Sequence, residues 1–129
     1  MKFKRQEGFR YSFGRPLDAG VVVLIEGKPL DVEQTQIPCE ILDISPRGLK
    51  IMSGEDFNEH ANKVLQLEIS FILDSTEIKG IGEIVWSKKI GSGYHYGITF
   101  FNQSNVEDLI INELKLRRRK EISQARIKR

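Results

Sequence analysis

Residues 64–73 read VLQLEISFIL, a run in which apolar and polar side chains alternate. Successive residues of a strand point to opposite faces. The apolar members therefore dominate one side: Val64, Leu65, Leu67, Ile69 and Phe71. The polar residues between them share the other: Gln66, Glu68 and Ser70. One buried face and one wet face indicate an antiparallel meander or barrel strand.

Five further runs around this stretch have the same character. They are GVVVLIEGKPL (20–30), QIPCEILDI (36–44), GLKIMS (48–53), EIKGIGEIVWSKK (77–89) and YHYGITFF (94–101). The connectors DST (74–76) and IGSG (90–93) suit hairpins, and 53–65 is predicted to be a loop or a single helical turn. Short strands without long helices between them predict an all-β fold, a six-stranded antiparallel β-barrel.

The periodicity changes after Phe101, where a C-terminal α-helix is predicted. Ser104 and Glu107 fit a capping box, so the helix should begin near Asn105. Its stripe should pack on the barrel: Val106, Leu109, Ile110, Leu114 and Arg117. We therefore divide the chain into a flexible basic N-terminal arm (1–8), a barrel with its helix (9–116) and a basic C-terminal tail (117–129).

Composition restricts the class of protein. A chain of 129 residues, 40% hydrophobic, is long enough for one domain with a core. It has no run of eighteen apolar residues and no secretory signal, so we expect a cytoplasmic protein without a transmembrane segment. Cys39 is the single cysteine, and with only His60 and His95 beside it no zinc spacing exists. We expect no disulfide and no metal.

The net charge of +2 is unevenly distributed. Five basic residues against Glu7 give residues 1–15 a charge of +4, and eight against Glu121 give residues 115–129 a charge of +7, which leaves −9 for the middle. A binder of long polyanions would spread its positive charge over the fold. The pattern favours a local anion site at one or both ends.

The stretch LDISPRGLKI, residues 42–51, ends one strand and begins the next. Asp43 and Ser45 are two apart and share a face, and residues 45–48 match a type I turn with proline second and glycine fourth. Asp43 can accept from N–H groups, Ser45 can donate to an oxyanion, and Gly48 allows a ligand or another backbone to approach closely. The same residues also suit an ordinary turn.

KRQEGFRY, residues 4–11, carries Arg5 and Arg10 close to the N-terminus. Read alone, it is a solvated charged end. Arginine, however, binds phosphate with a planar fork and pairs with guanine O6 and N7, while a carboxylate such as Asp43 accepts from the amino edge of guanine. Together the two stretches could hold a guanine nucleotide.

KRQEGFR, DISPRG, the GEIVW strand, the YHYGITF strand and the amphipathic helix together resemble a PilZ domain over about residues 3–116. The resemblance implies a six-stranded barrel that binds the bacterial second messenger cyclic di-GMP through RxxxR and [D/N]xSxxG motifs. Asp43, Ser45 and Gly48 match the second motif. In the first, Arg10 matches the final arginine and Arg5 the first of the frequent RR pair, whereas Gln6 replaces the second.

The resemblance implies that Arg5, Arg10, Asp43, Ser45 and Gly48 bind cyclic di-GMP, and that binding orders the N-terminal arm and signals to an unidentified protein partner. No catalysis is expected, and a homodimer is a further option. Two alternatives stay open: an adaptor that has lost the nucleotide, indicated by the glutamine, and a small-barrel nucleic-acid binder that uses the basic tail. For the aromatic residues of the later strands, we expect packing in the core or across strands: Trp86, Tyr94, Tyr96, Phe100 and Phe101.

Overall fold

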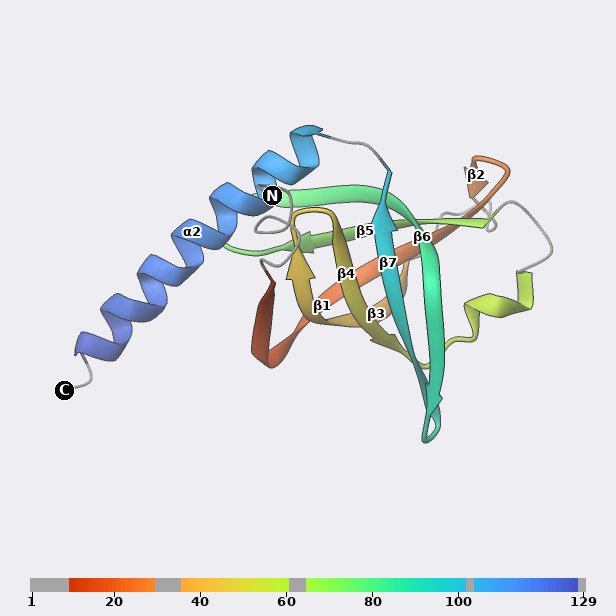
Figure 1. The fold of residues 1–129 in the computed structure, drawn as a ribbon, viewed down its shortest axis with the longest axis horizontal. Coiled ribbons are helices and arrows are strands. Elements are labelled where there is room, and N and C mark those ends of the chain that lie inside the picture. Colours follow the sequence, from red (N-terminus) through yellow and green to blue (C-terminus); the bar gives the residue numbers. More distant parts are fainter. Residues whose placement is uncertain (1–9, 30–35, 61–64, 102–103, 128–129) are drawn as a thin grey trace, which may run out of the picture.

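The computed structural model describes residues 10–29, 36–60, 65–101 and 104–127 (Figure 1). The strands in these residues are β1 (Tyr11–Ile25), β2 (Lys28–Pro29), β3 (Ile37–Ser45), β4 (Gly48–Ser53), β5 (Leu65–Ile72), β6 (Glu77–Ile90) and β7 (Gly93–Phe100). A 3-10 helix, Phe57–His60, lies between β4 and β5, and the helix α2 (Ser104–Ile127) follows β7.

The six long strands form a closed antiparallel barrel, which confirms the predicted fold. Their order is β1-β3-β4-β7-β6-β5, and β1 also pairs with β5 over Gly20–Ile25 and closes the barrel. The two-residue β2 pairs only with the end of β1. Every pairing is antiparallel, as the alternating pattern predicted.

Strand β1 begins nine residues earlier than the apolar run at Gly20 indicated, at Tyr11. Its pairing with β3 shifts register between Ser12 and Leu17, a bulge or irregularity that carries Gly14 and Pro16. Glycine and proline interrupt an alternating pattern but are tolerated in a bulge, so the strand continues through them. This early start brings the N-terminal end of β1 beside the β3–β4 turn, where Ser12 pairs with Asp43.

The core fills the barrel and extends under α2. Leu67, Ile69 and Phe71, the inward members of the alternating run, are buried. From the helix, Val106, Ile110 and Leu114 are buried against the barrel, which confirms most of the predicted stripe. The helix begins at Ser104, at the predicted capping box.

The helix α2 extends into the basic C-terminal segment. It continues past Leu116 to Ile127, and Figure 1 shows its second half projecting beyond the barrel. Arg117 belongs to the packed part, because its guanidinium lies 5.1 Å from the ring centre of Phe13 and its Nη1 donates to the carbonyl of Leu73 at 2.8 Å. The side chains of residues 118–125 are exposed.

Glu113 fastens α2 to the β5–β6 turn. Its side chain is buried, and one carboxylate oxygen accepts the backbone N–H groups of Asp74, Ser75 and Thr76 at 2.9–3.0 Å. Burial alone would raise the pKa of Glu113, but the three N–H donors outweigh it and the pKa is lowered. Lys120 adds an ion pair to Asp74 at 2.8 Å.

We expect Glu113→Gln to lower the free energy of unfolding by about 1.5–3 kcal/mol at neutral pH, because charge-assisted hydrogen bonds become neutral ones. Since the folded pKa is lowered, the contribution of the carboxylate is complete above the ordinary pKa of 4.5 and is lost as the pH falls through the folded pKa. Urea unfolding from pH 7 to pH 3 measures both effects. The exposed Glu77→Gln is the control, and equal stability of the two variants would contradict the role of Glu113.

Candidate functional site

A pocket of about 560 Å³ lies between the barrel and the first turns of α2. Its walls are the β3–β4 turn, neighbouring parts of β6 and β7, and one face of the helix. The lining residues are Arg10, Asp43, Ser45–Lys50, Val85, Trp86, Gly97–Thr99, Glu107, Asp108 and Ile111. The volume lies in the range of small-molecule binding sites.

Arg10 and Asp43 meet in this pocket, although they are 33 positions apart in the chain. Pairing of β1 with β3 places them together, and Nη1 of Arg10 donates to Oδ1 of Asp43. The arginine side chain is 46% exposed and the aspartate 15%, so the guanidinium is accessible to a ligand while the carboxylate is largely covered. Arg5 lies outside the described residues.

Ser45 and Gly48 line the pocket and also build the turn beside it. The Ser45 side chain is buried, and its hydroxyl donates to the carbonyl of Gly48 at 3.4 Å, a long bond. A Cβ at Gly48 would stand 2.5 Å from the carbonyl oxygen of Ile98, so only glycine lets β4 lie this close to β7. Of the two roles predicted for Gly48, the structure shows the approach of another backbone.

The pocket also contains charged residues that the sequence did not assign to it. Lys50 of β4 lies opposite Asp43 of β3 in the register of the two strands. Nε of Arg47 lies 3.7 Å from Oε2 of Glu107 on α2. With Arg10 and Asp108, the described lining holds three cations and three carboxylates. A bound anion must therefore compete with carboxylates for both arginines.

Trp86 supplies an aromatic wall to the pocket. Of the two kinds of packing expected for it, in the core or across strands, the structure shows the second: Trp86 packs on Gly97, its partner in β7, and 44% of its surface is exposed. A Cβ at Gly97 would lie 2.0 Å from the indole Nε1. Tyr96 and Phe100 are buried as expected, whereas Phe101 is exposed.

The beginning of β1 is held by α2. The hydroxyl of Tyr11 donates to Oε2 of Glu121 at 2.7 Å, and burial, followed by this bond, raises the pKa of Tyr11. Its ring stands edge-on to Phe13, which in turn lies under Arg117. The residue next to Arg10 is thus attached to the outer half of the helix.

Within the residues that the structure describes, no three acidic, histidine or cysteine side chains are placed to hold a metal ion. None of the described helices is long and apolar enough to span a membrane.

Gly97→Ala should displace the indole of Trp86, because the added Cβ needs the space that the ring occupies. Trp86 is the single tryptophan of the chain, so the emission maximum reports its environment directly, and we expect a shift to longer wavelength. Gly54→Ala, at a site with no atom within 4 Å, is the matched control. An unchanged emission maximum in Gly97→Ala would contradict the packing of Trp86 on Gly97.

A closed six-stranded barrel with a C-terminal helix, and a ligand-sized pocket between the two, defines the structural class of this chain. The family model of the PilZ domain matches residues 5–116, and the chain belongs to this family. Among solved structures, the "PilZ domain with c-di-GMP of YcgR from Escherichia coli" is similar, with a TM-score of 0.63, 11% sequence identity, and coverage of 91% of this chain and 94% of that chain. No curated protein matches the sequence.

Proposed function

We propose that this chain is a cytosolic receptor for cyclic di-GMP and binds the nucleotide in the pocket between the barrel and α2. The observation that carries the proposal is the meeting of Arg10 with Asp43 in that pocket, since each comes from one of the two motifs. Family membership and the similarity to a PilZ domain solved with c-di-GMP support it. No reaction is involved.

Arg10 and Asp43 exchange partners when the ligand enters. The guanidinium leaves the carboxylate and donates to a phosphate oxygen or to O6 and N7 of guanine, both of which suit its planar fork. Asp43 then accepts from the N–H groups of a guanine edge. The ion pair of Arg10 with Asp43 is broken, and two charge-assisted contacts replace it, one from Arg10 to the ligand and one from the ligand to Asp43. The two new contacts compensate for the loss of the first.

The remaining site residues shape the pocket. Ser45 and Gly48 hold the β3–β4 turn, so the carboxylate of Asp43 keeps its position. Trp86 offers an exposed ring face on which a base can stack, an interaction worth about 1–3 kcal/mol. Arg5 contributes a second guanidinium from the N-terminal arm.

Binding draws the arm onto the barrel and so creates a new surface beside α2 for a partner protein. The support for this step is the contact chain from Arg10 through Tyr11 to Glu121, which joins the pocket to the outer half of the helix. When the ligand orders the arm, the surface changes where β1 meets α2. Ordering of a segment by a ligand is a common form of switching.

Arg10→Ala should weaken cyclic di-GMP binding at least tenfold in calorimetric titration, because a charge-assisted contact of roughly 1.5–3 kcal/mol is lost. Arg15→Ala is the matched control, since Arg15 lies exposed on β1, five residues after Arg10, and outside this pocket. Thermal unfolding of both variants checks that the barrel is intact. Absence of saturable binding by the natural protein up to about 100 µM would refute the receptor.

A second candidate function is favoured by Gln6 together with the two ion pairs of the pocket. A glutamine cannot supply the bidentate charged fork of arginine, and Arg10 and Arg47 already have carboxylate partners. In that case the chain acts as an adaptor by protein contact alone. The same titration separates the two functions, because the adaptor takes up no nucleotide.

Gln6→Arg should tighten cyclic di-GMP binding by one to two decades, since it restores a contact of roughly 1.5–3 kcal/mol. Gln36→Arg, a glutamine outside this pocket, controls for the general effect of added charge. Equal affinity of Gln6→Arg and the natural protein would mean that Arg5 or Lys4 already makes the contact expected of an arginine at position 6.

A further inference from the structure

The outer half of β6 has one open edge. Strand β5 pairs with β6 only from Glu77 to Gly82, whereas β7 follows it to Ile90. Among the described residues, no strand pairs with the other edge of residues 83–90. Unpaired backbone N–H and C=O groups of a strand edge are a template for another strand.

Three side chains of this segment are large, apolar and exposed. Val85, Trp86 and Ile90 are three of the seven large hydrophobic residues that the described surface exposes. A long exposed edge with apolar side chains is a surface that proteins normally cover or blunt. Such an edge can pair with a strand of another molecule.

Charges of opposite sign stand at equal distances on either side of Trp86. Glu83, Trp86 and Lys88 pair with Thr99, Gly97 and His95 of β7, which are spaced two apart and share one face. Glu83 precedes Trp86 by three residues and Lys88 follows it by two. The bulge or irregularity between Ile84 and Trp86 takes up the extra residue, so both charges lie two β7 positions from Trp86. Neither charged side chain has an ion-pair partner in the described part of the chain.

Such a pattern is complementary to itself. If two β6 edges run antiparallel about a two-fold axis at Trp86, Glu83 of each copy lies opposite Lys88 of the other, and the two indoles are neighbours. A two-fold interface requires this self-complementarity. We propose that β6 is the dimer interface of this protein and that its partner is a second copy of the chain.

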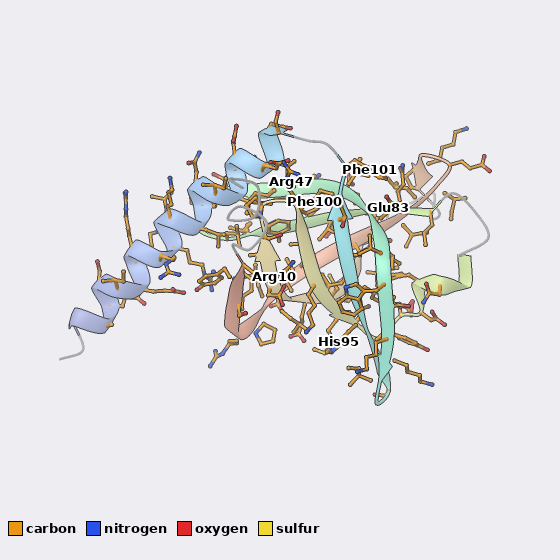
Figure 2. The ribbon with its side chains drawn as sticks, in the orientation of Figure 1. Arg10, Arg47, Glu83, His95, Phe100 and Phe101 are labelled. Atoms are coloured by element: carbon orange, nitrogen blue, oxygen red, sulfur yellow. The ribbon has the colours of Figure 1, made fainter. Side chains whose placement is uncertain are left out.

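The contact of the 3-10 helix with β6 does not cover the proposed face. Nδ2 of Asn58 donates to Oγ of Ser87 at 2.8 Å, and Ser87 pairs with the buried Tyr96, so it points to the opposite side of the sheet. Figure 2 labels Glu83 on the upper part of β6, above the projecting β6–β7 hairpin. The side chains of Glu83, Trp86 and Lys88, on the other face, are exposed.

Sedimentation equilibrium of the full chain, over about 1–200 µM and without nucleotide, tests the interface. We expect a dimer of the natural protein. Glu83→Lys and Lys88→Glu should each weaken it about tenfold or more, because two attractive pairs become repulsive. Mixing the two variants should restore it, since every altered position then faces a charge of opposite sign.

Several results would overturn the interface. They are a natural protein that is monomeric over the whole range, single variants that dimerise as well as it does, and a mixture that stays monomeric. Thermal unfolding of each variant confirms that the barrel is folded. Arg15→Glu, an equal charge change outside the outer half of β6 (residues 83–90), should leave the dimer unchanged. Because nucleotide is absent, the result is independent of the proposed receptor function.

Discussion

The pairing of β1 with β5 is the constraint on which the rest of the structure depends. Only this pairing turns a row of six strands into a barrel with an enclosed core. Closure also fixes where the ends of the strands lie, so the β3–β4 turn and the hairpin of β5 and β6 both come within reach of α2. The pocket and the Glu113 attachment are consequences of that placement.

The helix α2 has two roles: it covers the core of the barrel and it forms one wall of the pocket. Its first turns bring Glu107 and Asp108 to the pocket, and its middle is fixed to the barrel by Glu113. A displacement of the helix would therefore change the charge that a ligand meets. Ligand affinity and helix position are linked, and each must influence the other.

The barrel could be predicted from sequence because alternation has one physical solution, burial of one face, and turn residues mark the strand ends. Asp43, Ser45 and Gly48 were predicted as site residues from the local sequence around the turn, and the structure places all three in the lining of the pocket. The sequence left open whether Trp86 packs in the core or across strands, because the irregularity between Ile84 and Trp86, which turns the indole outward, has no local signature. Glu107 reaches the pocket only because α2 packs on the barrel, which no local pattern records, whereas Lys50 lies opposite Asp43 in the same hairpin.

The bond of Tyr11 to Glu121 fixes the point from which the N-terminal arm can reach. Because Tyr11 is held by α2 and paired with β3, Arg10 cannot slide along the barrel to bring another residue into its place. Arg5 is five residues from Arg10, which limits it to a radius of roughly 17 Å at about 3.3 Å per residue. Under the proposed function, the number of residues between the two arginines therefore sets the greatest distance from Arg10 at which Arg5 can contact the nucleotide.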